Sequence, residues 1–261
     1  MIITGDGMEN FDATKTANEI IEYVRDYYKS HNIKGAVIGI SGGKDSGVVA
    51  GLMVKAIGAD NVVGLKLPCH SSSDDSSLAD LVSSHYGFKL YNCDLTKSFD
   101  EFESSVAKVI DVDSSHLHNS SINLKPRLRM SALYYWAAMM SSLKGGTYLV
   151  VGTSNKSELY VGYFTKGGDN VNDIALLADL TCEEVIAVGE VVGVPKEVLY
   201  RTPSDGLSGM SDEQKLGVTY RDIAKYMEDS ASVAPDVAVK IERLHRNSRH
   251  KFNQNYYKKG K

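Results

Sequence analysis

Short apolar runs alternate with amphipathic segments along most of the chain. Buried strands are predicted where Val, Ile and Leu cluster, at 36–40, 62–67, 88–93 and 148–152. Apolar residues at helical spacing predict helices at 18–28, 46–57, 78–86, 98–110, 127–143 and 184–191. Strands that alternate with helices in this way indicate an α/β fold with a central parallel sheet flanked by helices.

Some segments depart from this pattern. The helix expected at 127–143 is apolar around its whole circumference, so it lies either in the core or at an interface with a second subunit. The stretch 153–173 is long, glycine-rich and polar, which is typical of a functional lid or a disordered segment. A Ser/Asp-rich loop is expected at 70–77.

Length and composition narrow the function classes. The 261 residues, 43% hydrophobic and 24% charged, suffice for one large α/β domain with a full core. A net charge of −4 disfavours general nucleic-acid binding, and no apolar run approaches the ~18 residues of a membrane span. The three cysteines are widely spaced and no signal-peptide pattern precedes them. We therefore expect a cytoplasmic protein that binds neither nucleic acid nor membrane.

The most informative segment is Ser41-Gly42-Gly43-Lys44-Asp45-Ser46, between the first strand and its helix. Small residues let backbone N–H groups approach a phosphate, and the helix N-terminus adds partial positive charge. The order of residues is not that of a Walker loop. A carboxylate at Asp45 would repel a phosphate unless a cation lay between them, which indicates Mg²⁺. An ordinary turn explains the glycines and serines but not Asp45.

The pattern Ser-Gly-Gly-x-Asp-Ser resembles the loop of the PP-loop ATP pyrophosphatase superfamily, whose members cleave ATP between its α and β phosphates. Later segments make the resemblance more specific, namely 123–130, 152–158, 162–173, 202–207, 212–213 and 216–220. Together they resemble the ammonia-dependent NAD synthetases from about residue 18 to residue 251. The resemblance implies a Rossmann-like adenine nucleotide α-hydrolase fold and one NAD synthetase domain over 1–261.

The family's reaction is a C–N ligation. In the first step ATP adenylates the nicotinate carboxylate of deamido-NAD with the help of Mg²⁺, and pyrophosphate is released. In the second step ammonia displaces AMP, and NAD is formed. The chain has no room for the amidohydrolase domain of glutamine-using relatives, so free ammonia is the expected donor. The family also implies a homodimer, which suits the apolar helix at 127–143.

The resemblance also implies site residues. Asp45 and Glu158 match metal-binding carboxylates, and we expect Lys44, where relatives often have an uncharged residue, to act beside them as a catalytic group. The expected ATP-binding residues are Ser41, Gly42, Gly43, Lys44, Asp45, Ser46, Arg129, Thr153 and Ser204. Those expected to bind deamido-NAD are Tyr27, Asn123, Arg127, Tyr134, Tyr163, Lys166, Asp173, His250 and Lys251. Thr153 and Ser204 could equally cap helices, and Tyr134 could equally be a core residue.

The sequence departs from the family pattern at two positions. Relatives often have a lysine where this chain has Cys182, and we hypothesise that Lys44 supplies that positive charge from within the loop. Asn119 stands near where relatives often have an aromatic residue against the nicotinate, so stacking on the substrate is weaker or comes from elsewhere.

Two other functions stay open at this point. Another PP-loop enzyme would amidate a different nucleotide or modify tRNA, and the tRNA version predicts a basic groove or an added RNA-binding domain, neither of which is evident. A nucleotide-binding regulator without turnover predicts a damaged metal pair, whereas Asp45 and Glu158 are both present.

Overall fold

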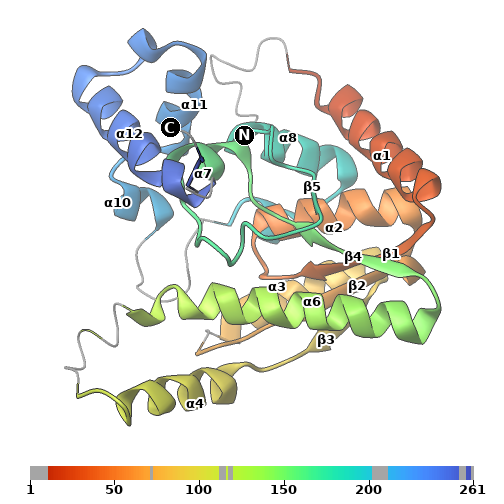
Figure 1. Cartoon of the computed structure of the whole chain (residues 1–261). Coiled ribbons are helices and arrows are strands. Elements are labelled where there is room, and N and C mark those ends of the chain that lie inside the picture. The colour runs from red at the N-terminus through yellow and green to blue at the C-terminus, as the bar shows by residue number, and fades with distance from the viewer. Residues whose placement is uncertain are drawn as a thin grey trace.

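A five-stranded parallel sheet forms the centre of the protein (Figure 1). The computed structural model describes residues 11–70, 73–111, 116, 120–201, 211–252 and 257–259, without the side chains of 73–75. The strands are β1 (Ile33–Gly39), β2 (Val62–Lys66), β3 (Lys89–Asn92), β4 (Thr147–Gly152) and β5 (Ile174–Ala175), in the spatial order β3-β2-β1-β4-β5. The predicted fold class is confirmed.

The strand order reverses between β1 and β4, and this positions the site. In register, Val37 of β1 lies between Val63 of β2 and Val150 of β4. In doubly wound parallel sheets, ligands bind in the crevice beyond the carboxyl ends of the strands at such a reversal. The segments that follow β1 and β4 are 41–46 and 153–158, which both carry predicted site residues.

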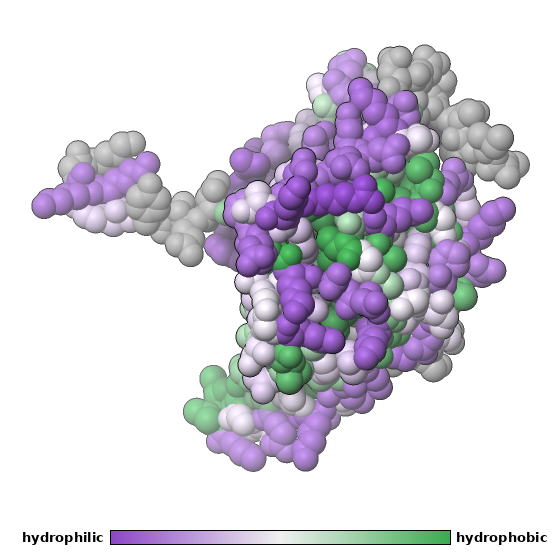
Figure 2. Space-filling view, turned by 90° about the vertical axis from the view of Figure 1, so that its right-hand side faces the viewer, coloured by the Kyte–Doolittle hydropathy of each residue, from purple (hydrophilic) through white to green (hydrophobic). Residues whose placement is uncertain are grey.

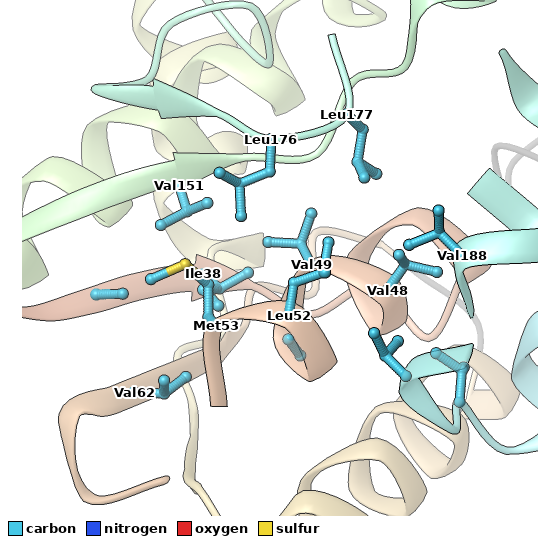
Figure 3. Packing of buried hydrophobic residues seen from close by; sticks show 14 of the residues in the cluster. Ile38, Val48, Val49, Leu52, Met53, Val62, Val151, Leu176, Leu177 and Val188 are labelled. Atoms are coloured by element: carbon cyan, nitrogen blue, oxygen red, sulfur yellow. The ribbon is translucent and has the colours of Figure 1, made fainter. Parts of the chain in front are cut away.

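One face of the sheet is covered by α1 (Ala13–Ser30), α2 (Lys44–Ile57), α3 (Ser73–Tyr86) and α8 (Cys182–Val192). Ile38 and Val151 point from the strands toward Val49 of α2, and Val188 of α8 closes the cluster from the other side (Figure 3). Burial of these aliphatic side chains fixes α2 against the sheet, and with α2 the loop that precedes it.

The opposite face is covered by α4 (Thr96–Ala107) and α6 (Leu124–Lys144), which pack on Val37 and Val150 through Phe99, Ala137 and Met140. On the outer side of α6, Tyr135 is 71% exposed and Leu143 is 69% exposed. One of the two sequence alternatives required this helix to be enclosed in the core of the chain. The exposure of its outer side shows that it is not.

The C-terminal part forms a smaller cluster of helices beside the sheet (Figure 1). It comprises α7 (Lys156–Val161), α10 (Asp212–Leu216), α11 (Tyr220–Glu228) and α12 (Pro235–Ser248), whereas α9 (Lys196–Leu199) packs against α2, α3 and α8 in the main core. Turns of 3₁₀ helix lie at Ala59–Asn61, Ser230–Ser232 and Arg249–Lys251. The buried apolar centre of this C-terminal cluster contains Val161, Cys182, Ile223 and Ile241. Helices α11 and α12 therefore pack on α7, and α11 also packs on α8, near the phosphate loop.

The predicted strands and long helices are confirmed to within a few residues, but two expected loops are wrong in part. Helix α3 begins at Ser73, inside the loop expected at 70–77, and α7 lies inside the polar stretch 153–173. Six residues are too few to show helical periodicity, although Asn155 and Glu158 have the spacing of a capping box. Cys69 and Cys182 are buried and Cys93 is half-buried, and no disulfide joins any of the three. Among the described residues, no helix is both long and apolar enough to cross a bilayer.

Candidate active site

The loop after β1 is closed on itself by its serines. The backbone N–H of Gly43 donates to Ser41 Oγ (3.2 Å), and Ser46 Oγ donates to the Gly43 carbonyl (3.0 Å). Gly42 has φ +79°, a conformation that glycine adopts without steric cost. Gly43 is the N-cap of α2 and has no side chain that could satisfy the first N–H groups of the helix. This end of α2 can therefore accept an anion.

Lys44 is buried, with only 5% of its surface exposed, and its Nζ lies 2.7 Å from Asp45 Oδ2. Burial alone would lower the pKa of Lys44, but the negative charges of Asp45 and Glu158 outweigh it and raise the pKa. The ammonium therefore stays charged and compensates the carboxylates around it.

Helix α7 brings Glu158 to the same place. The Asn155 Oδ1 accepts from the Glu158 N–H (3.0 Å), and the Glu158 Oε2 accepts from the Asn155 N–H (3.1 Å), which is a complete capping box. Asn155 is fully buried, and its Nδ2 donates to Asp45 Oδ1 (3.1 Å). Burial and the charge of Asp45 raise the pKa of Glu158 to about 8, although Lys44 acts in the opposite direction.

The residues present fit a shared magnesium site. Asp45 lies close enough to Glu158 for its negative charge to disfavour the charged form of Glu158, which is the condition that a divalent cation relieves. In the part of the chain that the structure describes, no three His, Cys, Asp or Glu side chains are grouped to hold a metal. Mg²⁺ commonly takes only one or two protein carboxylates and completes its shell with water and phosphate oxygens, so two carboxylates suffice.

Asp212, at the start of α10, is a buried carboxylate near this pair. Its charge contributes to the raised pKa of Glu158, and its Oδ1 accepts from the Tyr163 hydroxyl (2.9 Å). Tyr163 was predicted to bind deamido-NAD, so this bond connects the predicted substrate region with the metal region.

A second set of predicted residues meets around the loop 162–173. Arg127 Nε donates to the Lys166 carbonyl (3.2 Å), and Lys166 Nζ donates to the His250 carbonyl (2.8 Å). Lys251 Nζ donates to the carbonyls of Gly162 and Phe164, both at 2.7 Å.

Asn123 belongs to the same set, because its Oδ1 accepts from the Thr165 hydroxyl (2.9 Å). The loop is thus held between the start of α6 and the turn that follows α12. Of the predicted deamido-NAD residues, Asn123, Arg127, Lys166, His250 and Lys251 come together here.

The remaining predicted residues take separate places. Tyr134 donates to Asp173 Oδ1 (3.1 Å), and Asp173 Oδ2 accepts from the Val150 N–H of β4 (2.7 Å). Arg129 Nε donates to the Leu67 carbonyl (3.1 Å), just beyond β2. Tyr27 is on α1, where its ring lies 4.4 Å from that of His31, a neighbour on the same segment rather than another predicted site residue.

Three further predictions concern Thr153, Ser204 and Asn119. Thr153 follows β4 as expected, but the N-cap of α7 is Asn155, so the alternative that Thr153 caps a helix is wrong for α7. Ser204 and Asn119 lie outside the described residues.

Sequence reasoning missed Asn155, Asp212 and Tyr220 as parts of the site, although each lies in a quoted motif. Asn155 had a usable signal, because Asn followed three residues later by Glu is the pattern of a capping box. Asp212 and Tyr220 had none, since only tertiary packing brings them to the phosphate loop.

Comparison with known proteins gives a consistent result. Residues 16–255 match the profile of the NAD synthase family. The NH(3)-dependent NAD(+) synthetase of Alkaliphilus oremlandii is 40% identical over 244 residues, which cover 91% of this chain and 94% of that protein. The solved NMN synthetase of Francisella tularensis superposes with a TM-score of 0.85 at 30% identity, covering 96% of this chain and all of that one.

A more distant structure agrees on the fold. The NH3-dependent NAD synthetase of Campylobacter jejuni, only 22% identical, superposes with a TM-score of 0.75 over 95% of this chain and all of that one. The resemblance inferred from the motifs is thus confirmed by a profile that spans most of the chain. With its phosphate loop, carboxylate pair and strand order in place, the chain belongs to the NAD synthase family.

Proposed function

We propose that the protein is an ammonia-dependent NAD synthetase that amidates deamido-NAD in an ATP-dependent reaction. One observation carries the proposal: Asp45, Lys44 and Glu158 lie close together beside a loop suited to phosphate binding, at the point where the strand order reverses. A loop that binds anions next to a carboxylate pair suits a metal-bound polyphosphate and little else. The name of the Alkaliphilus relative supports ammonia as the nitrogen donor.

In the adenylation step the nicotinate carboxylate attacks the α-phosphorus of ATP, and pyrophosphate leaves. Mg²⁺, held by Asp45 and Glu158, would neutralise charge on the phosphates. The N–H groups at the start of α2 and the hydroxyl of Ser41 bind phosphate oxygens, Ser46 holds the loop in shape through the Gly43 carbonyl, and Lys44 adds a buried positive charge. These groups are fixed before the reaction, so they stabilise the departing pyrophosphate without reorganisation.

In the second step ammonia attacks the acyl carbon of the adenylate, and AMP leaves with the bonding electrons. Arg127, at the start of α6, and Lys166, on the loop 162–173 to which it is hydrogen-bonded, are placed to bind the pyrophosphate bridge of deamido-NAD. Lys166 donates to the His250 carbonyl and Lys251 donates to the Gly162 carbonyl, so these bonds hold the loop 162–173 against the turn after α12. A loop closed over the bound deamido-NAD limits hydrolysis of the adenylate by water.

The proposal includes a homodimer of single-domain chains in the cytoplasm. Tyr135 and Leu143 of α6 and Phe102 of α4 expose apolar surface on the same face of the sheet. Figure 2, which views the molecule from the end where α6 finishes, shows hydrophobic areas set among hydrophilic residues. Several large apolar side chains exposed on one face of the sheet suit a subunit interface.

A second candidate is favoured by one observation. The Francisella tularensis structure, with a TM-score of 0.85, is an NMN synthetase, so its product is a mononucleotide. The same chemistry on this chain would amidate nicotinate mononucleotide instead of the dinucleotide. The two substrates share the reacting carboxylate and differ by an AMP group, so the phosphate loop and carboxylates serve both equally.

Product analysis separates the candidates. Purified protein with ATP and Mg²⁺ is given either deamido-NAD or nicotinate mononucleotide, with ammonium or with glutamine. Stoichiometric NAD, AMP and pyrophosphate from deamido-NAD and ammonium would support the proposal. Preferential turnover of the mononucleotide would support the second candidate, and ATP binding without turnover of either would leave a regulator.

A further inference from the structure

A buried hydroxyl near the carboxylates has no partner in the part of the chain that the structure describes. Tyr220, the first residue of α11, is 4% exposed, and its Oη makes no hydrogen bond there. Its backbone N–H is satisfied by Glu213 Oε1 (2.8 Å), and its ring packs with Cys182 and Ile223. A buried donor without an acceptor costs free energy and is uncommon in native proteins.

The surroundings of this hydroxyl belong to the active site. Lys44 Nζ lies 5.9 Å from the centre of the Tyr220 ring. Burial and the negative charges of Glu158, Asp212 and Asp45 raise the pKa of Tyr220, so the phenol keeps its proton and remains able to donate it in a hydrogen bond.

We propose that the Tyr220 hydroxyl donates a hydrogen bond to an oxygen atom of the metal–phosphate cluster, either a phosphate oxygen of ATP or a water on Mg²⁺. A cation drawn in by the carboxylates brings oxygen ligands with it, and these lone pairs are the acceptors that the phenol lacks. Tyr220 is thus a ligand-binding residue contributed by the C-terminal helices, which makes the packing of α11 part of nucleotide binding. The identity of the ligand rests on the proposed function.

Removal of the hydroxyl tests this directly. In Tyr220→Phe, the Kd for MgATP measured by calorimetry is expected to rise about tenfold, the loss of one charge-assisted hydrogen bond. The Tm of the ligand-free protein is expected to stay the same or rise, because an unsatisfied donor has been removed. The matched control is Tyr28→Phe. Tyr28 is the other buried tyrosine whose hydroxyl has no partner among the described residues, and its loss should leave the Kd unchanged.

A second titration identifies the acceptor. Mn²⁺ alone, followed by its EPR signal, binds more weakly to Tyr220→Phe if the acceptor is a metal-bound water, and equally well if it is a phosphate oxygen. An unchanged Kd for both MgATP and Mn²⁺, or a lower Tm without ligand, would overturn the inference, the latter because the hydroxyl then serves the fold. Wild-type protein that fails to bind MgATP would instead overturn the proposed function.

Discussion

Asn155, which follows β4, holds Asp45, which follows β1, with its Nδ2 3.1 Å from Asp45 Oδ1. The same side chain caps α7 through Oδ1 and so fixes the position of Glu158. One buried amide therefore sets the separation of the two carboxylates that are proposed to bind Mg²⁺. A residue with this role is a positioning residue, because it acts through Asp45 and Glu158.

Replacing Asn155 separates its two roles. Serine can still cap the helix but cannot reach Asp45, so Asn155→Ser is expected to keep a near-normal Tm while the Kd for MgATP rises about tenfold. Asn155→Ala loses the cap as well and should unfold about 1 kcal/mol more easily than the serine variant. Asp12→Ala, which removes the N-cap of α1, is the control, since it should lower the Tm and leave MgATP binding unchanged. Equal MgATP affinity in Asn155→Ser and wild type would rule out the positioning role.

The buried ion pair of Lys44 and Asp45 gives a second prediction. Lys44→Met leaves two carboxylates without their cation, which is expected to lower the free energy of unfolding by about 3 kcal/mol, and added Mg²⁺ should recover part of the loss. The exposed pair of Lys156 and Asp179 is the control, since Lys156→Met should cost less than about 1 kcal/mol. Turnover of Lys44→Met at the wild-type rate would refute the hypothesis that this lysine supplies charge to the phosphates.

The fold and the phosphate loop were predictable because they depend on local pattern. The spacing of apolar residues predicts the strands and long helices, and six consecutive residues, 41–46, predict the phosphate loop. The tertiary neighbours of the site were not predictable, because Tyr220 reaches Lys44 and Asp212 reaches Glu158 only through the packing of α10 and α11, which sequence periodicity did not reveal. The capping box of α7 shows the intermediate case, a local signal that was overlooked because the helix is short.

Stability should depend on pH and Mg²⁺ together. The folded-state pKa of Glu158 is raised from 4.5 to about 8, so the folded protein holds this proton more tightly than the unfolded chain does. The contribution of Glu158 to the free energy of unfolding is therefore complete below pH 4.5 and is lost as the pH rises through about 8. Mg²⁺ needs the ionised carboxylate, so the increase in Tm on adding Mg²⁺ should be larger at pH 8.5 than at pH 6.5.

The control for this dependence is Glu158→Gln. Glutamine preserves the capping box but does not titrate, so the Mg²⁺ effect on Tm should become small and independent of pH. An equally pH-dependent Mg²⁺ effect in Glu158→Gln would assign the titration to another group.

The contacts of Lys251 predict a selective effect on the nicotinate substrate. Lys251→Met keeps the apolar stem but removes two hydrogen bonds to the carbonyls of Gly162 and Phe164. The loop 162–173 should then be held less firmly, so the KM for deamido-NAD is expected to rise about tenfold while the KM for ATP changes less than about twofold. Lys259→Met, at an exposed position of the tail, should change neither constant. A parallel rise in both constants would argue against a role confined to the loop.

Gly162 tests whether the contact between α7 and α12 supports the site. It has φ +70°, and a Cβ built there would lie 2.0 Å from Ser248 Cβ, so Gly162→Ala must displace α12 as well as strain the backbone. Gly145→Ala is the matched control, because Gly145 has φ +63° but no atom within 4 Å of the added carbon, and its cost should be about 1 kcal/mol.

Chemical denaturation of both variants is expected to show that Gly162→Ala costs at least about 2 kcal/mol more than Gly145→Ala. Since α12 leads directly into His250 and Lys251, the same variant should also raise the KM for deamido-NAD. If the two alanine variants lose equal stability, α12 adjusts freely to the added carbon. The turn after α12 would then be too loosely anchored to hold the loop 162–173 in place.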